Sequence, residues 1–562
     1  MIRRLILAGL AAAAPFAASA QAPRKLDLVM APHASAHRLD VTMTMAAPDF
    51  QAGEAVVRLP LKLVGIPTAR YDGDALRASD AAGPLPLVQE EEPPTPQGVY
   101  RRWKATRASR GDVVIRYAAP PRAVSAATNN GPLFDLREEG GGFVGAGVGF
   151  IATPARSGPW AVSLKWDLRD APPGSRGAWS LGEGDVDVVV PSDVLSFSYY
   201  AVGPLNSIPA AGGGGFGMYW LGTPPFDPQA LGTRIQQLYA AMSAFFHDTG
   251  KSYRVFARQN PYAGLGGSAL ARSFMFGYRP ADRPTLDKLQ SLIAHEMAHN
   301  WPKMRGEHGD TAWYSEGTAE YYSLILAHRA GLLDADRLLT ELNKRAYDYA
   351  TNPFRPLSNV EAAKRFWTDP TAQTIPYGRG LIYLIQTDAA IRTASGGKRS
   401  LDDVVLAMRA RELAGQPYGI PDWLALVGQE IGAATARQGY DAMASGALLR
   451  APANRFAPCY RLVPGTAQQF ELGFARASLS DDRVVRGLVP GSAAALAGVR
   501  DGDVIVEAGD LNTIRSEPAA TMTLTLRRGD ATTTVRYAPR GASVSLDRWQ
   551  RDPAAPAPAC RF

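Results

Sequence analysis

The sequence is poor in cysteine, in long apolar runs and in blocks of like charge, and each scarcity excludes a class of protein. Only two cysteines occur in 562 residues, which excludes a disulfide-rich scaffold and a cysteine-ligated metal cluster. After residue 20 no stretch is apolar enough to cross a bilayer, so we expect no stable membrane insertion. The net charge of +7 is spread along the chain without a basic block, which argues against nucleic acid as a partner.

The first residues have the layout of a secretory signal. Arg3 and Arg4 precede an Ala-rich apolar run that ends in the small residues Ala18, Ser19 and Ala20. This order is typical of a cleaved signal peptide, and the run falls short of the ~20 apolar residues that an uncleaved anchor needs. We therefore predict a signal peptide over residues 1–20 and a periplasmic or secreted mature protein.

The two cysteines, Cys459 and Cys560, both lie in the last fifth of the chain. In an oxidising compartment a disulfide between them is the simplest interpretation, and two separate buried thiols are the alternative. Closing a loop of about 100 residues stabilises a fold by roughly 4–5 kcal/mol in the chain-entropy model. The bond would join the two ends of the C-terminal segment.

The pattern of apolar residues changes along the chain. A chain of this length exceeds the ~250–300 residues that one core usually supports, so we expect about three domains. Residues 21–190 carry short alternating runs separated by Gly, Pro and Asp, which predict an antiparallel β domain. Helical periodicity dominates a second domain at 191–450, and strand patterns return in a third at 459–560.

The motif HEMAH at 295–299 lies in an amphipathic run that predicts a helix over 286–299. Residues four apart share one helix face, so His295 and His299 can face one ion with Glu296 beside it. Zinc held by three protein ligands keeps a position for water and lowers the pKa of that water to about 7. Glu296 is then placed to accept a proton. The motif also arises by chance, so a third ligand is needed.

Two carboxylates in the segment WYSEGTAEYY, 313–322, supply the candidate third ligand. A helix that starts here presents Glu316 and Glu320 one turn apart on the same face. We assign Glu316 as the ligand and Glu320 as the partner of a ligand imidazole, and an exchange of these two roles stays open. The expected cofactor is one Zn²⁺ per chain, held by His295, His299 and Glu316. His308, between the two segments, we leave outside the site.

The segments HEMAHNW and WYSEGTAEYY together resemble the glycyl aminopeptidase family of bacterial gluzincins. The resemblance implies a multidomain α+β fold, with an N-terminal antiparallel β domain, a thermolysin-like, mainly helical catalytic domain and a C-terminal PDZ-like β domain. Residues 471–474, ELGF, and 489–505 are similar to the Gly-rich loop, short helix and strand entry of PDZ domains. Few residues remain for the second PDZ helix, which puts peptide binding by strand addition in doubt.

The resemblance implies roles for further residues. Related gluzincins use a Tyr in a Tyr-x-x-Gly setting to stabilise the oxyanion of the tetrahedral intermediate. The segment IPYGRGL at 375–381 gives Tyr377 this role, with an ordinary packed tyrosine as the alternative. Arg379 we interpret as a surface charge. Family members carry a Tyr-x-Gly-Leu-Glu-His segment beside the cleft, which implies that Gly264, Leu265 and Gly266 contact substrate.

Two departures from the family pattern bear on specificity. Gly266 stands where family members have a Glu that helps to hold a free substrate amino terminus, and a buried ammonium without a partner is unfavourable. The loop between the zinc segments, 300–315, is also shorter than in the family. An endopeptidase or a dipeptide-type peptidase therefore stays open beside the aminopeptidase.

The function that follows from these residues is zinc-dependent hydrolysis of peptide bonds. The resemblance implies an aminopeptidase with a preference for small N-terminal residues, acting on a peptide substrate, with possible peptide or protein contact through the PDZ-like domain. The alternative from another class is a non-catalytic binding protein with a silent zinc site. Structural zinc usually has four protein ligands, often thiolates, and no cysteine lies near His295.

Overall fold

A computed structural model describes residues 22–562 except 96–97, 127, 129–130, 211–213, 263, 271, 367–368, 480–481, 510 and 557–559. The predicted signal peptide, 1–20, lies outside these described residues. The chain forms two compact units, one of residues up to 123 together with 134–204, the other of 124–133 together with 205–562. The three-domain division of the sequence stays a prediction.

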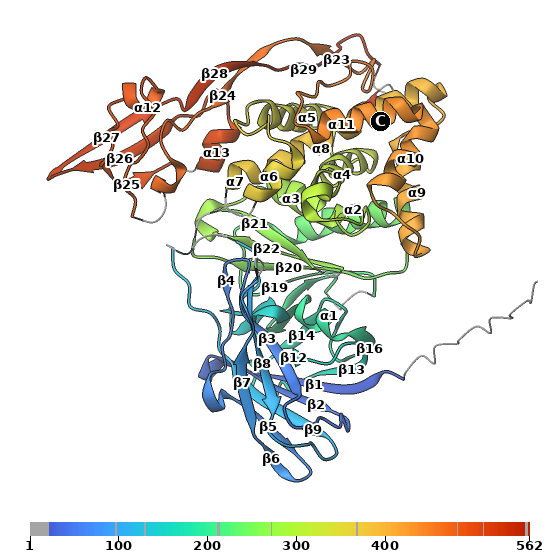
Figure 1. Cartoon of the computed structure of the whole chain (residues 1–562), viewed down its shortest axis with the longest axis vertical. Coiled ribbons are helices and arrows are strands. Elements are labelled where there is room, and N and C mark those ends of the chain that lie inside the picture. Colours follow the sequence, from blue (N-terminus) through green and yellow to red (C-terminus); the bar gives the residue numbers. More distant parts are fainter. Residues whose placement is uncertain are drawn as a thin grey trace, which may run out of the picture. The chain divides into compact units, whose positions relative to one another are not determined.

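The first unit is built from strands in three sheets (Figure 1). The seven-stranded sheet has the order β16 (Val186–Pro191), β13 (Pro159–Trp166), β1 (Arg24–His33), β2 (Arg38–Met45), β9 (Val113–Ala119), β5 (Leu76–Asp80) and β6 (Gly83–Leu85). A second sheet has the order β10 (Arg137–Glu139), β11 (Gly142–Ala146), β17 (Tyr199–Gly203), β14 (Arg176–Trp179) and β15 (Gly182–Glu183). The third has the order β12 (Thr153–Pro154), β3 (Ala55–Leu63), β8 (Gly98–Ala105) and β7 (Leu87–Glu91), with β4 (Ile66–Pro67) paired to β3. The short helix α1 (Ser192–Ser196) follows β16.

Alternation of apolar and polar residues forms these strands and fills one core. In β2 every second side chain is buried, as expected when one face of a strand packs inward. Trp103, Trp160 and Trp179 are each at most 1% exposed within this core. The described pairs are antiparallel except that β1 runs parallel to β13. The β-rich N-terminal region predicted from the sequence is thus confirmed, with this one parallel pair added.

The second unit begins with a five-stranded sheet in the order β18 (Asn206–Ile208), β19 (Phe216–Trp220), β20 (Tyr253–Gln259), β22 (Ser273–Tyr278) and β21 (Gly266–Leu270). The strands β19, β20 and β22 are parallel, and the edge strand β21 is antiparallel to β22. The parallel strands are almost wholly buried, because helices cover such sheets. Helix α2 (Pro228–Phe245) connects β19 to β20.

Helices make up the middle of this unit. They are α3 (Leu286–Ala298), α4 (His308–Arg329), α5 (Ala335–Ala350), α6 (Asn359–Arg365), α7 (Pro370–Gln373), α8 (Ile375–Ser395), α9 (Leu401–Leu413), α10 (Ile420–Ile431) and α11 (Ala433–Ala444). The apolar faces of α3, α4, α5, α8, α9, α10 and α11 share one large core with α2 and the five-stranded sheet, whereas α6 and α7 bury Ala362 and Ala372 in a small separate cluster. The helical middle region predicted from the sequence is confirmed.

Helices α4 and α8 approach each other unusually closely. A Cβ atom added to Gly317 of α4 would lie 2.6 Å from the Gly380 backbone, and one added to Gly380 would lie 2.0 Å from the Trp313 carbonyl oxygen. Only residues without a side chain fit at this crossing. The contact fixes the start of α8 beside the face of α4 that carries Glu316.

The C-terminal strands form small sheets. They are β23 (Tyr460–Val463) with β29 (Arg548–Arg551), β24 (Thr466–Phe470) with β28 (Arg540–Ser545), and β25 (Val504–Ala508), β26 (Met522–Arg528) and β27 (Ala531–Tyr537) in that order. With α12 (Ala493–Leu496) and α13 (Leu511–Ser516) the last sheet has a hydrophobic core of its own. Arg476 and Arg515 of this region donate to the hydroxyls of Thr371 and Thr374, beside the start of α8.

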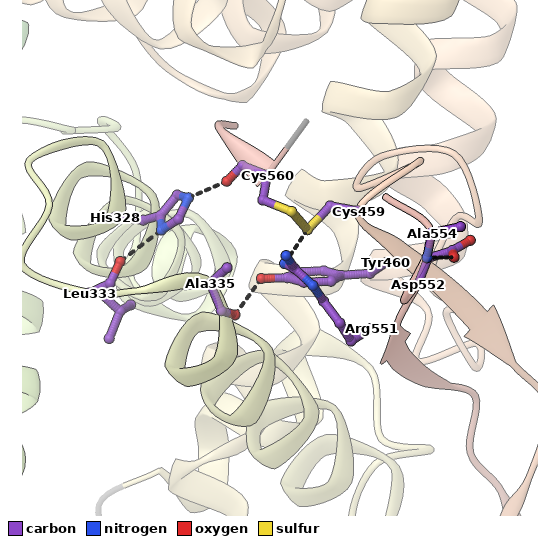
Figure 2. Close-up of a disulfide and its surroundings, with 9 residues drawn as sticks. All are labelled: His328, Leu333, Ala335, Cys459, Tyr460, Arg551, Asp552, Ala554 and Cys560. Atoms are coloured by element: carbon purple, nitrogen blue, oxygen red, sulfur yellow. Dashed lines mark hydrogen bonds between the residues drawn. A yellow bond between two sulfur atoms is a disulfide. The ribbon is translucent and has the colours of Figure 1, made fainter. Parts of the chain in front are cut away.

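A disulfide joins Cys459, after α11, to Cys560 near the C-terminus (Figure 2). Both cysteines are buried, and Arg551 donates to the Sγ of Cys459. The ring nitrogens of His328 on α4 contact the carbonyl oxygens of Cys560 and Leu333 at 2.6 and 2.7 Å. The bond therefore attaches the end of the chain to the helical core. Among the described helices, none combines the length and apolarity that crossing a membrane requires.

Candidate metal centre and catalytic cleft

Helix α3 carries His295 of the HEMAH motif in its last turn, and His299 directly follows its last residue. The Thr285 hydroxyl accepts from the Lys288 backbone N–H and caps the start of the helix, which satisfies a donor that the helix cannot pair internally. The apolar face of α3 packs in the core, and four-residue spacing places His295 and His299 on one side. Their Nε2 atoms lie 3.2 Å apart. The helix predicted over 286–299 starts at the same residue in the structure and ends one residue earlier, at Ala298.

Helix α4 brings Glu316 to the same point. Its Oε2 atom lies 3.2 Å from His295 Nε2 and 3.4 Å from His299 Nε2. One ligand atom from each of the three residues falls within 4.8 Å of the others. Two imidazole nitrogens and one carboxylate oxygen are a donor set that zinc accepts, with a fourth position left for a small molecule. The described side chains therefore fit the metal that the sequence predicts.

Glu320 occupies the other side of His295. Its Oε1 atom lies 3.3 Å from His295 Nδ1, and its second oxygen accepts from Arg345 of α5, which also pairs with Glu341. The geometry thus gives the two carboxylates of α4 different places, with Glu316 facing the Nε2 pair and Glu320 facing Nδ1. A carboxylate on the second nitrogen of a ligand histidine orients the ring and raises its basicity.

The charges of this cluster shift one another's pKa values. Burial disfavours the imidazolium of His295, but the neighbouring Glu320 and Glu316 raise the pKa of His295 overall. Burial acts against the carboxylate of Glu316, yet its contacts with His295 and His299 lower the pKa of Glu316. Without a metal, the site therefore holds a proton on His295 and keeps Glu316 ionised.

Glu296, between the two histidines in sequence, lines the cleft with His299 and Glu316. Burial raises the pKa of Glu296, and the nearby His299 and His295 partly offset this. A carboxylate of raised pKa accepts a proton more readily than an exposed one, which suits a general base. The role of Glu296 as a general base stays a prediction.

Tyr377, in the first turn of α8, lies against the candidate metal ligand His295. Its ring stacks on the ring of His295 with centroids 5.4 Å apart and planes 9° from parallel. Burial and the carboxylates of Glu316 and Glu296 raise the pKa of Tyr377 well above its ordinary value. The phenol is therefore a neutral hydrogen-bond donor at physiological pH.

A cavity of about 530 Å³ opens beside the cluster. The described residues that line it are Ala269, Leu270, Arg272, Glu296, His299, Asn300, Lys303, Ser315 and Glu316. Gly264, Leu265 and Gly266, which the resemblance assigns to substrate, are not among them. Gly264 lies two residues before β21 with φ +103°, Leu265 packs against the core, and Gly266 starts β21 opposite Gly277.

Several neighbours of the site were not found from the sequence. Ser315 Oγ lies 3.4 Å from His299 Nδ1, and Arg345 holds Glu320 from a different helix. Ser315 lies next to Glu316 in the sequence and was open to prediction, whereas nothing in the sequence marks Arg345. The expectation that Arg379 is a surface charge is wrong, because this residue is fully buried and donates to the carbonyl oxygens of Arg355 and Leu357 at 2.7 and 2.6 Å.

His308 begins α4 and does not lie in a loop. The loop between the zinc segments is therefore shorter than the sequence suggested, since α4 already includes residues 308–315. The ring of His308 packs edge-on against Phe366 with centroids 4.5 Å apart. His308 is not among the residues that line the cavity or converge on the metal position.

Comparisons with known proteins give one family match and several structural matches. Residues 288–375 match the family model of the M61 glycyl aminopeptidases. A solved aminopeptidase N family protein from Idiomarina loihiensis matches with a TM-score of 0.65 and 17% identity, over 93% of this chain and 98% of that chain. Yeast LTA4 hydrolase matches with a TM-score of 0.44 and 13% identity, over 75% of this chain and 67% of that chain. No curated protein matches the sequence.

The first of these structures shares the fold of this chain across nearly its full length. The mixed helix and sheet fold predicted from the sequence is therefore confirmed. The family match includes both zinc segments and ends at the start of α8. The resemblance to the glycyl aminopeptidase family predicted from the two motifs is confirmed over this segment.

Proposed function

We propose that this chain, a member of the glycyl aminopeptidase family by its segment 288–375, is a zinc-dependent peptidase. The observation that carries the proposal is the convergence of His295, His299 and Glu316, whose ligand atoms lie within 4.8 Å of one another. Glu320 on the far nitrogen of His295 supports it, because such carboxylates accompany metal-ligating histidines. The fold match is consistent with this activity.

A zinc ion held there would supply a Lewis acid that polarises a carbonyl and acidifies water. The residues of the chain do the rest. Glu296 accepts a proton from the attacking water and delivers it to the leaving amine. The hydroxyl of Tyr377 donates to the oxyanion that forms on the carbonyl, where its raised pKa keeps the proton in place. Glu320 and Arg345 hold the ring of His295.

The test is the variant Glu296→Gln. We expect both this variant and the unaltered protein to bind one zinc per chain, and the variant to lose hydrolysis of peptides, because an amide cannot accept the proton. Zinc content is measured by elemental analysis and cleavage by mass spectrometry of a peptide library. Hydrolysis that survives in the variant would refute the mechanism, and hydrolysis that survives complete removal of zinc would refute the proposal.

The second candidate within the same chemistry is an endopeptidase or dipeptide-type peptidase, which Gly266 favours. A free substrate ammonium finds no carboxylate at this position, and burying it without a partner is unfavourable. Paired peptides with free and acetylated amino termini separate the versions. Equal rates on both would exclude a strict aminopeptidase, whereas loss of cleavage on acetylation would exclude the endopeptidase.

The rival function, a binding protein with a silent zinc site, differs in its outcome. Zinc-loaded protein that is inert toward the library but retains a stable partner in solution would support it.

We further propose export with a cleaved signal peptide, since the buried disulfide suits an oxidising compartment. Peptide is the proposed substrate, and the C-terminal region with its PDZ-like segments is a proposed site of protein contact.

A further inference from the structure

Two cations line the cavity beside the catalytic residues. Arg272 borders it from the connection between β21 and β22, and Lys303 borders it from the segment that follows α3. Glu296 and Glu316 are the only acids among the described residues that line the same cavity. Both acids are assigned to the metal and to proton transfer, so neither is free to neutralise these cations.

Arg272 is held in place at a cost to the backbone. It lies in the two-residue connection between the paired residues Leu270 and Ser273, with φ +48°. Such turns favour Gly or Asn, because a side chain in the left-handed region is strained. The guanidinium donates to Asp248 at 2.8 Å and to the Ser252 carbonyl at 2.8 Å. The strained arginine therefore places an anchored cation at the wall of the cavity.

The acid that faces Arg272 is shared. Asp248 also accepts from the indole of Trp301 at 2.9 Å and lies 3.7 Å from the guanidinium of Arg409. Arg409 in turn interacts with Glu412. Asp248 is thus shared between two guanidinium groups and does not serve Arg272 alone.

Lys303 adds a second charge with donors to spare. Its Nζ atom donates to the His299 carbonyl oxygen at 2.5 Å, and an ammonium has three N–H groups. By its accessible surface the residue is exposed. Desolvation of its ammonium and the nearby Arg409 lower the pKa of Lys303, and Glu412 partly offsets this at longer range than a hydrogen bond. A carboxylate in the cavity would find an ammonium with two unused donors.

We propose, on the basis of the proposed peptidase function, that Arg272 and Lys303 form a subsite that binds a carboxylate of the peptide substrate. Asn300 and Ser315 line the same cavity and add polar groups to its walls. Two cations at one wall of the cavity attract acidic groups and repel basic ones nearby, and this discriminates between substrates that are alike in size. The carboxylate comes from an Asp or Glu side chain or from the peptide C-terminus.

The test uses a series of peptides. In each peptide one position near the scissile bond carries Glu, Gln or Lys, and every peptide is made with a free and with an amidated C-terminus. For the zinc-loaded protein we expect kcat/KM to be about 5- to 10-fold higher for the peptide with Glu at the preferred position than for the peptide with Gln. The peptide with Lys at that position should have the lowest kcat/KM of the three. The difference should lie in KM, because charge recognition in the ground state lowers KM without raising kcat. A preference confined to free C-termini would assign the carboxylate to the chain end.

The charge-reversing variant Lys303→Glu should invert the order, with Lys peptides preferred over Glu peptides. Lys288→Glu is the matched control, because Lys288 is exposed in the first turn of α3, about 16 Å along the helix axis from His299 at 1.5 Å per residue. We expect the control to retain the preference of the unaltered protein. An unchanged order in Lys303→Glu, or equal rates on Glu and Gln peptides in the unaltered protein, would overturn the subsite.

A binding measurement separates this proposal from the proposed function. Calorimetric titration of Glu296→Gln with the Glu and Gln peptides reports the subsite even if no peptide is hydrolysed. We expect tighter binding of the Glu peptide, and a preference that weakens as salt is added. Equal affinities would refute the subsite, whereas a clear preference in a protein without hydrolysis would retain the subsite and reject the peptidase.

Discussion

The variant Glu320→Gln tests how the metal position is held. In the structure Glu320 Oε1 lies 3.3 Å from His295 Nδ1, and the two side chains are only 12% and 10% exposed, so salt screens their interaction little. Glutamine keeps the size but removes the charge that orients the imidazole. Loss of such a partner weakens metal binding about 10- to 100-fold, which is about 1.4–2.8 kcal/mol.

The structure provides a matched control for this variant. Arg345 pairs with both Glu320 and Glu341, so either carboxylate can be removed without leaving the guanidinium unpaired. Glu341→Gln perturbs the same arginine without contact to His295. We therefore expect the zinc affinity of Glu341→Gln to stay within about 3-fold of the unaltered protein, well below the 10-fold loss expected when the histidine partner itself is removed.

Zinc affinity is measured by competition with a chromogenic chelator at fixed pH, with thermal unfolding as a check on folding. The reasoning would be refuted if Glu320→Gln bound zinc as tightly as the unaltered protein. It would also fail if Glu341→Gln lost as much affinity as Glu320→Gln, because the effect would then come from Arg345.

Three further predictions follow from the site. In Tyr377→Phe we expect kcat to fall about 10²- to 10³-fold with zinc content unchanged, and a kcat within a few-fold of the original would reject the oxyanion role. Gly380→Ala should lower the melting temperature and the activity, because the added Cβ would meet the Trp313 carbonyl. In the control Gly439→Ala the added Cβ has room on α11, so this change should be neutral or stabilise the fold by up to about 1 kcal/mol. Zinc uptake at pH 7 should release protons, because the raised pKa keeps His295 protonated in the metal-free site. Zinc binding should therefore weaken as the pH falls. Calorimetric heats of zinc binding that do not depend on the buffer would contradict this.

Local patterns predicted the elements that carry the chemistry. The helix over 286–299 was predicted from apolar residues at helical spacing, and both motif histidines must then share a face. The carboxylates Glu316 and Glu320 follow from the same spacing one helix later. These features depend on neighbours within four residues, so the sequence displays them directly.

Other features depend on contacts that spacing does not reveal. Helix α4 begins at His308, before the predicted start at Trp313, and no side chain caps it, so tertiary packing extends it. Arg379 was interpreted as a surface charge, but it is buried and donates to the carbonyl oxygens of Arg355 and Leu357, which lie 24 and 22 residues earlier in the chain. Residues 124–133 belong to the second compact unit although the first unit surrounds them in sequence.

The central claim is that two imidazoles and one carboxylate bind one zinc ion. Anomalous diffraction at the zinc absorption edge, from crystals of the mature protein, measures this directly. We expect one strong peak per chain, about 2.0–2.2 Å from His295 Nε2, His299 Nε2 and a carboxylate oxygen of Glu316. A zinc-loaded protein whose peak lies elsewhere, or a protein that takes up no zinc, would contradict the account.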